Sequence, residues 1–198
     1  MRILSLCDFT GIMLKPWAEA GHECVAVDID QPDPGERDGI EYVRADLLEP
    51  GSWGLHWDLV FAFPPCTHLS GSGARWWAEK GLRPYIESLQ LVAACLDICR
   101  TAPAWMLENP VGRLSQTLGE PSFTFDPCDY GGYLDPPGDF YTKRTCIWAS
   151  DTFNVPAKRP THPSEGSKMH LMAPSDERHR LRSVTPEGFA RAVYEANR

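Results

Sequence analysis

The chain has 198 residues and a formal net charge of −8, from 19 Lys and Arg against 27 Asp and Glu. This length is typical of one domain with a sizeable core. The acidic balance disfavours a large interface with duplex DNA, because phosphate contacts need a basic surface. The sequence has neither a bilayer-spanning apolar run nor a secretory leader, so we expect a cytoplasmic protein.

Charge is unevenly distributed along the chain, and the cysteine pattern indicates the redox state of the thiols. Residues 1–150 carry 11 Lys and Arg against 21 Asp and Glu, a net charge of −10, whereas residues 151–198 carry 8 against 6, a net charge of +2. The seven cysteines form no C-x-x-C pair, which favours reduced thiols over a disulfide framework or a zinc ribbon. Cys95 and Cys99 lie four apart in an apolar stretch and are expected in the core.

The first 30 residues have a β-α-β pattern. We expect a strand over 2–7, a turn that ends at Gly11, a helix over 12–20 and a strand over 24–30. In nucleotide sites an acid at the tip of the second strand, here Asp28 or Asp30, binds ribose hydroxyls, and a glycine turn admits the ligand. The full G-x-G-x-x-G pattern is absent, and a strand-end acid can equally be a solvated loop residue.

The centre of the chain is the stretch around Cys66. A loop over 31–39 and a short strand over 41–44, followed by Asp46, lead to an apolar strand over 59–63. Pro64-Pro65 ends that strand, because proline lacks the ladder N–H. Cys66 and a Ser/Gly loop come next, at the edge where open α/β sheets place their chemistry. A structural cysteine in a strand-to-loop corner is the alternative.

A second polar strand end follows. Of the adjacent Trp76 and Trp77, one is expected to anchor the loop to the core and the other to stack on a base. A helix is expected over 85–99 and a strand over 104–107, which ends at Glu108-Asn109-Pro110. Two successive strands therefore bring Cys66 and Glu108 to one rim of the sheet.

The last third is rich in loops. Short strands are expected over 122–125 and 142–148, a mobile loop with His162 and His170 over 149–184, and a terminal helix over 185–197. Thr185 is its expected N-cap and Pro186 its first residue. Arg178, Arg180 and Arg182 are most simply a solvated surface. The whole pattern predicts one Rossmann-like α/β domain over 1–198, with a mostly parallel sheet and helices on both faces.

Several motifs, taken in order, resemble those of S-adenosylmethionine-dependent cytosine-C5 methyltransferases, most closely small phage-type members. The resemblance covers roughly residues 1–150 and rests on Asp8-Phe-Thr-Gly11, Asp28, Asp46, Phe63-Pro-Pro-Cys66, Glu108-Asn-Pro110 and Thr142-Lys-Arg144.

The resemblance implies a covalent mechanism. C5 of cytosine is too electron-poor to attack a methyl sulfonium, so a Cys66 thiolate would first add to C6 and create an enamine at C5. Glu108 would hold N3 and the exocyclic amine, and Arg144, alone or together with Lys143, would lie near the base carbonyl. A neighbouring cation or helix N-terminus would be expected to lower the pKa of Cys66. The implied cofactor contacts are Phe9, Gly11, Asp28, Asp46 and Pro64, and the implied substrate contacts are Pro65, Asn109 and Lys143.

The chain also departs from the family. Met13 and Leu14 stand where the family has its second and third glycines, and the acid of its first motif corresponds to Cys7 or is displaced to Asp8. Only residues 149–184 are available for the recognition region of family members that read a DNA sequence. The expected partner is therefore a free cytosine nucleotide, single-stranded DNA or DNA read with a partner, with no membrane involved.

Other functions are weighed against this one. An amino-methyltransferase acting on N4 of cytosine or N6 of adenine needs Asp, Asn or Ser before the prolines, where this chain has Phe63. A catalytically inactive methyltransferase-fold binding protein, or an acidic DNA mimic, would suit the negative charge but has no need of Cys66. Cys66, His68 and Cys128 lack a recognised metal-ligand spacing, so no metal is expected. No spacing supports Cys/His hydrolase chemistry.

Overall fold

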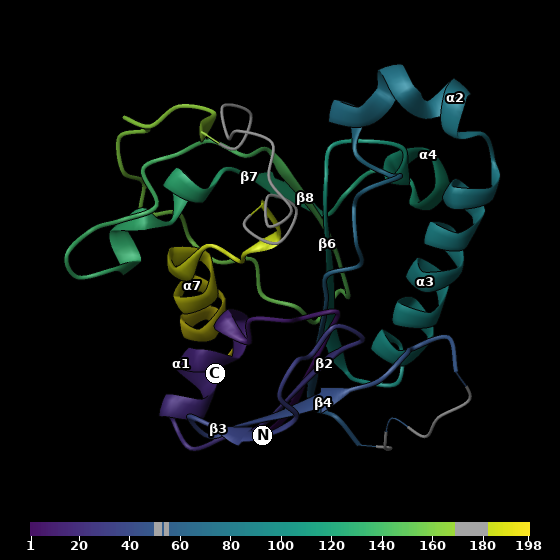
Figure 1. Ribbon diagram of the computed structural model, residues 1–198. Coiled ribbons are helices and arrows are strands. Elements are labelled where there is room, and N and C mark those ends of the chain that lie inside the picture. Colours follow the sequence, from purple (N-terminus) through teal and green to yellow (C-terminus); the bar gives the residue numbers. More distant parts are fainter. Residues whose placement is uncertain (50–52, 54–55, 169–181) are drawn as a thin grey trace.

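The computed structural model describes residues 1–49, 53, 56–168 and 182–198. Within them the chain forms an eight-stranded sheet in the order β3-β4-β2-β1-β5-β6-β8-β7 (Figure 1). Neighbours from β4 to β6 pair in parallel, whereas β3, β8 and β7 pair antiparallel. The strands are β1 Arg2–Leu6, β2 Glu23–Asp28, β3 Gly35–Arg37, β4 Ile40–Arg44, β5 Leu59–Ala62, β6 Ala104–Pro110, β7 Phe123–Phe125 and β8 Thr145–Ala149.

Helices cover both faces of the sheet. The long helix α3 packs on β5 and β6 on one face, while α1, η1 and α7 pack together on the other (Figure 1). This confirms the predicted Rossmann-like α/β architecture. The helical elements are η1 Ile12–Leu14, α1 Lys15–Glu19, η2 Gly71–Trp76, α2 Trp77–Lys80, α3 Arg83–Cys99, α4 Leu114–Leu118, η3 Pro127–Asp129, η4 Gly131–Tyr133 and α7 Glu187–Asn197.

The central strands are apolar because both of their faces are covered. All four residues of β5 are fully buried. Ile3 and Phe61 face Trp17 and Phe189 in one core cluster, and Val60 belongs to a second cluster with residues of α3. As predicted, Cys95 and Cys99 are buried there, and all seven cysteines are free thiols. Two cores, one on each face, hold the sheet edge that carries the site.

Several element boundaries differ from the sequence prediction. The strand expected to end at Leu107 continues to Pro110, because β8 pairs with it from Met106 to Pro110. The loop predicted over 31–39 contains β3, which pairs with β4. The strand expected to start at Thr142 starts at Thr145, so Lys143 and Arg144 precede it. Each change depends on a pairing between distant segments that local patterns do not reveal.

The helix caps differ as well. The helix predicted over 12–20 is a 3-10 turn followed by the short α1. The terminal helix begins at Glu187, with Pro186 at the N-cap and no side-chain cap there. Asp139 satisfies a free N–H instead, since its carboxylate accepts a 2.8 Å hydrogen bond from the Gly188 N–H. The predicted Thr185 cap is therefore wrong, and Asp139, 49 positions before Gly188, caps the helix instead.

The segment predicted as a mobile loop over 149–184 has a hydrogen-bonded course as far as the structure follows it, to Lys168. Thr161 N–H donates to the Cys128 carbonyl over 2.7 Å, and Gly132 N–H donates to the Arg159 carbonyl over 2.9 Å. Residues 169–181, which include His170, Arg178 and Arg180, lie outside the described residues. No helix of the described chain is long and apolar enough to cross a membrane.

Candidate active site

Cys66 lies in a tight turn at the carboxyl end of β5. The Cys66 carbonyl accepts hydrogen bonds from the backbone N–H groups of Leu69 (3.0 Å) and Ser70 (2.8 Å). Before the turn, Phe63 N–H still donates to the Leu6 carbonyl over 3.0 Å, so the chain leaves the sheet only at the two prolines. The half-buried thiol is thereby held at the rim of the sheet, as predicted.

Glu108 stands on the neighbouring strand β6, opposite Ile147 of β8. Burial raises the pKa of its carboxyl group, while the charge of Lys143 and a hydrogen bond from Thr145 lower it. The raised pKa favours the protonated form, which can donate a hydrogen bond as well as accept one. The structure brings Glu108 close enough to Cys66 for its charge to raise the thiol's pKa.

Neighbouring cations act on the thiol of Cys66 as the sequence predicts, but they do not set the net direction of its pKa shift. Burial raises its pKa most, and the charge of Glu108 raises it further. The positive charges of Lys143 and Arg182 lower it, but the net direction is upward. A protonated Glu108 carries no charge, so burial alone would then raise the pKa of the thiol against the two cations. The thiolate therefore depends on the two cations and on the protonation state of Glu108.

Of the two adjacent cations before β8, Lys143 and not Arg144 faces this centre. The Arg144 guanidinium is 3.4 Å from the Asp126 carboxylate and donates to the Thr124 hydroxyl over 3.3 Å. Its side chain is 58% exposed. Lys143, the other cation of the motif, is thus the one whose charge acts on Cys66 and Glu108, and the role of Arg144 near the base carbonyl stays a prediction.

Asn109 and the two prolines hold the turn. Asn109 is fully buried, and its Nδ2 donates a 2.9 Å hydrogen bond to the Pro64 carbonyl. Its Oδ1 has no hydrogen-bond partner among the described residues. Pro64 is buried and Pro65 is exposed. This hydrogen bond fixes the Pro64–Cys66 corner to β6. The contact between Asn109 and substrate stays a prediction.

A hollow lies beside Glu108. The segment that precedes α7 closes one side of it, and aromatic rings close the other. Its described lining is Phe63, Glu108, Phe125, Lys143, Ser183, Val184, Thr185, Pro186 and Phe189. The hollow has a volume of about 10 Å³, and Cys66 is not part of its described lining. It brings one carboxyl group and one ammonium group together beside aromatic rings.

The other half of the rim is built around Asp8. This buried carboxylate accepts hydrogen bonds from the Ser5 hydroxyl (2.7 Å) and from the N–H groups of Thr10 (3.2 Å) and Gly11 (2.8 Å). Burial nevertheless raises its pKa. Gly11 has φ of +66°, and a Cβ there would lie 2.4 Å from the Tyr42 hydroxyl. The turn therefore requires glycine, and its acid is structural.

Two further carboxylates end the neighbouring strands β2 and β4. Asp28 accepts a hydrogen bond from the Asp30 N–H (2.8 Å), and Asp46 accepts one from the Leu48 N–H (2.9 Å). Ile29, between Asp28 and Asp30, is 58% exposed. This arrangement fits a nucleoside cofactor, because it combines half-buried acids suited to ribose hydroxyls with an exposed aliphatic side chain and a left-handed glycine turn. Phe9 lies in the same turn, where its carbonyl accepts from Gln31 Nε2 over 3.4 Å.

Sequence reasoning missed three residues of this rim. Arg182 was assigned to a solvated surface, yet its charge acts on Cys66. Thr145 bonds Glu108, and its place follows only from the pairing of β8 with β6. Ile29 could have been found, because an exposed aliphatic residue beside a strand-end acid is itself a signal of a ligand surface.

No protein-family model matches the chain, and no curated protein matches it. Distant likenesses exist among solved structures. The methyltransferase domain of bacterial-CtHen1-CN is 12% identical, with 75% of this chain and 90% of that chain covered and a TM-score of 0.41. A TehB-like SAM-dependent methyltransferase from Corynebacterium glutamicum is 16% identical, with 80% of each chain covered and a TM-score of 0.38.

A third likeness is the CcbJ methyltransferase from Streptomyces caelestis, at 16% identity and a TM-score of 0.35. The match covers 63% of this chain and 49% of that one, so this chain spans about half the length of the CcbJ protein. Likenesses this distant carry no inference about activity, which has to come from the site and the motifs.

Proposed function

We propose that this chain is an S-adenosylmethionine-dependent methyltransferase that adds a methyl group to C5 of cytosine through a covalent bond between Cys66 and C6. One observation carries the proposal. The parallel neighbours β5 and β6 place a thiol and a carboxyl group of raised pKa at one rim, close enough to interact. The motif resemblance supports the same chemistry independently of the structure.

Each residue has a role in this proposal. Protonated Glu108 donates to N3 of cytosine, which draws electrons from the ring and makes C6 electrophilic. The Cys66 thiolate then adds to C6, and the electron pair of the C5–C6 double bond moves toward C5. Lys143 and Arg182 stabilise the thiolate before the attack. Asn109 keeps the attacking sulfur in place through the Pro64 carbonyl.

The cofactor would occupy the other half of the rim, where it supplies an electrophilic methyl group on a sulfonium. Asp28 would hold its ribose hydroxyls, and Asp46 and Ile29 would border the base. The Gly11 turn, which the Asp8 hydrogen bonds close, lets the ligand approach the backbone. Because β1 and β5 are neighbours, the cofactor turn and Cys66 lie on adjacent strand ends.

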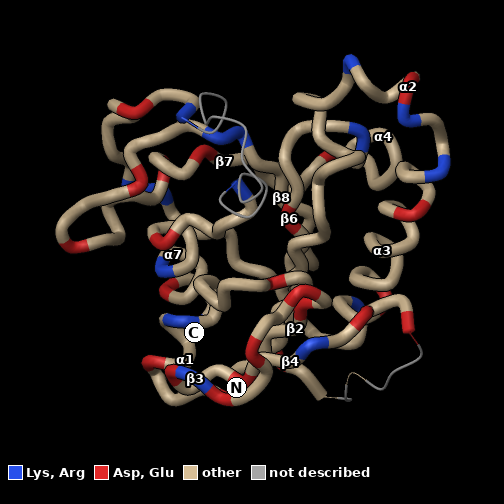
Figure 2. The backbone as a smooth tube through the Cα atoms, in the orientation of Figure 1, with Lys and Arg blue, Asp and Glu red and all other residues tan. Residues whose placement is uncertain are grey.

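The charge distribution argues against the acidic binding-protein alternative. Residues 1–63 hold 12 acids against 4 cations, whereas residues 64–118 hold 4 acids against 5 cations. The negative charge thus gathers on the cofactor half (Figure 2). A DNA mimic would need the acids as an extended surface.

The test is transfer of labelled methyl from S-adenosylmethionine to dCMP, dCTP, CMP, single-stranded DNA and duplex DNA. The proposal expects label at C5 of cytosine in at least one of them. Bound cofactor with no label on any member of the panel contradicts it and favours a binding protein. Label on an exocyclic amine favours the amino-methyltransferase.

A further inference from the structure

The two chain segments that leave Cys66 and Glu108 meet again beyond the site. Gly71 N–H donates to the Val111 carbonyl and Arg113 N–H to the Leu69 carbonyl, both over 2.8 Å. An isolated bridge joins Ser70 to Gly112. A Cβ on Gly112 would lie 2.0 Å from the Leu69 carbonyl oxygen, so only glycine permits this approach. The surface that follows is therefore fixed relative to the site.

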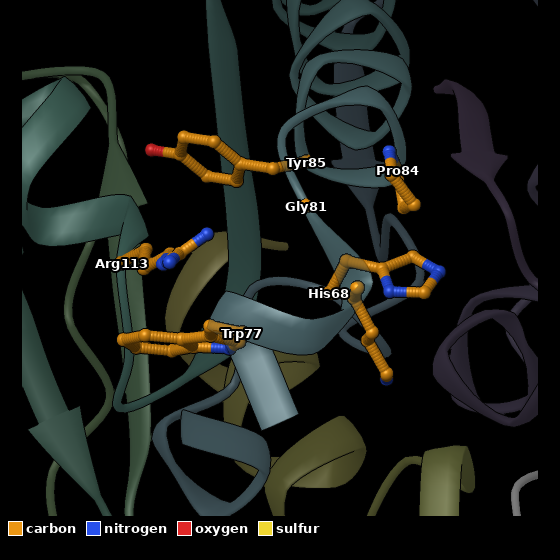
Figure 3. Close-up of a pocket in the computed structure, with 7 residues that line it drawn as sticks. His68, Trp77, Gly81, Pro84, Tyr85 and Arg113 are labelled. Carbon is orange, nitrogen blue, oxygen red and sulfur yellow. The ribbon is translucent and has the colours of Figure 1, made fainter. Parts of the chain in front are cut away.

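That surface contains a groove between α2 and the start of α3 (Figure 3). The Arg113 guanidinium lies between two rings, 3.8 Å from the centroid of Trp77 and 4.6 Å from that of Tyr85. His68 and Lys80 also line the groove. We call these five residues the cation–aromatic groove.

Two ring nitrogens of the groove have no hydrogen-bond partner among the described residues. They are Trp77 Nε1 and His68 Nδ1, and both atoms are buried. Burial lowers the pKa of His68 and the charge of Lys80 lowers it further, while the charge of Glu87 raises it. The buried Trp77 Nε1–H without a partner is costly, whereas the tautomer of His68 decides whether its Nδ1 is a donor or an acceptor. The positive charges of Lys80 and Arg113 suit an anion with several acceptor oxygens, above all a phosphate group.

The surroundings of the groove suit a nucleic acid strand. Trp76 is 47% exposed, and the Arg75 guanidinium lies 5.1 Å from its ring centroid. Trp77 is covered by Arg113, so Trp76 is the tryptophan of the pair with a free face. On this flank, Lys and Arg of the loop and helices are interspersed with acids of α2 and α3, while acids predominate around β2, β3 and β4 (Figure 2). An exposed ring beside a cation is a stacking platform for a base.

We infer that the cation–aromatic groove binds the phosphate next to the target cytosine of a single-stranded polynucleotide, and that Trp76 stacks on the adjoining base. The inference rests on the proposed function for the place of the target cytosine. A single strand is favoured over a duplex because paired bases offer no face to Trp76, and a chain of net charge −8 lacks an extended basic surface.

The test measures binding without chemistry. A fluorescein-labelled 12-mer of single-stranded DNA with one cytosine is titrated with the full chain at low salt, and fluorescence anisotropy gives Kd. Trp76→Ala and Lys80→Ala alter exposed side chains, so the fold is retained. Each is expected to raise Kd by about tenfold. Trp76→Phe should restore most of the affinity, because it keeps an aromatic face.

The matched control is Lys15→Ala, which removes an exposed lysine of α1 on the opposite face of the sheet. Its Kd should stay within about twofold of the parent. Equal losses for Lys15→Ala and Lys80→Ala would overturn the inference, as would a duplex 12-mer that binds as tightly as the single strand.

Methyl transfer to free dCTP separates this inference from the proposed function. If transfer to dCTP persists while Trp76→Ala leaves 12-mer binding unchanged, the groove inference fails and the proposed function stands. If Trp76→Ala weakens 12-mer binding although no substrate accepts label, the groove binds a single strand but has no target cytosine beside it, and the methyltransferase assignment fails.

Discussion

The rim of the sheet has two halves that are built in different ways. In the cofactor half, formed by the ends of β1, β2 and β4, carboxylates bond backbone N–H groups two or three residues ahead. In the chemical half, at the ends of β5 and β6, the pKa values of Cys66 and Glu108 depend on residues far away in the sequence, namely Lys143, Thr145 and Arg182.

The difference separates binding from reactivity. Local turns fix the shape of the cofactor half and leave its surface carboxylates near water. In the chemical half, burial is the largest cause of the raised pKa of both Cys66 and Glu108. Substitutions in the chemical half should therefore lower turnover with little change in cofactor affinity. Substitutions in the cofactor half should lower cofactor affinity with little change in the chemical step.

The largest effect is expected for Cys66→Ser. A serine hydroxyl is a far weaker nucleophile than a thiolate, so turnover should fall by more than about a thousandfold. Cofactor affinity by calorimetry should stay within about twofold, because the thiol is outside the cofactor half. Residual turnover near the parent rate would exclude the covalent adduct.

Glu108→Gln should lower the rate by about a hundredfold, since the amide cannot deliver a proton to N3. Single-turnover methyl transfer measures this effect, and thermal melting checks the fold. Glu87→Gln, on α3, is the control that changes an exposed acid. A near-normal rate for Glu108→Gln would remove Glu108 from the reaction.

In the cofactor half, Gly11→Ala should weaken cofactor binding by about tenfold, because a left-handed alanine costs about 1 kcal/mol and its Cβ meets Tyr42. Gly21→Ala is the matched control, with φ of +82° and nothing within 4 Å of its Cβ. It should lose a similar amount of stability without any change in cofactor affinity. Equal cofactor affinities for the two variants would argue against a ligand at the Gly11 turn.

The smallest effect is a shift in the pH profile. The charge of Lys143 lowers the pKa of both Cys66 and Glu108, so Lys143→Met raises both pKa values. The rate–pH profile should consequently move to higher pH. Arg144→Met, which removes the partner of Asp126, should leave the profile in place. A shift for Arg144→Met alone would return the basic role to Arg144.

The same contrast explains what the sequence could predict. Apolar runs stopped by Pro64-Pro65 and by Pro110 locate Cys66 and Glu108 at one rim, because parallel strand order follows from alternating strands and helices. Three other features depend on β8, whose antiparallel pairing has no local signal. They are the extension of β6, the position of Thr145 and the direction in which Lys143 points. The cap that Asp139 supplies to α7 is equally non-local.

The most direct test of the central claim is a covalent trap. In the proposed reaction, C5 loses its proton after it has taken the methyl group, and the electron pair of that C–H bond restores the C5–C6 double bond as the Cys66 sulfur leaves C6. Fluorine in place of this hydrogen cannot leave as a cation, so the sulfur–C6 bond should persist. The chain is incubated with S-adenosylmethionine and a single-stranded oligonucleotide containing 5-fluorocytosine, and intact-mass spectrometry is recorded after denaturation. The account predicts a one-to-one adduct with the added methyl, mapped by digestion to Cys66 and absent for Cys66→Ser. Methyl transfer to ordinary cytosine without any adduct to the fluorinated base would contradict it.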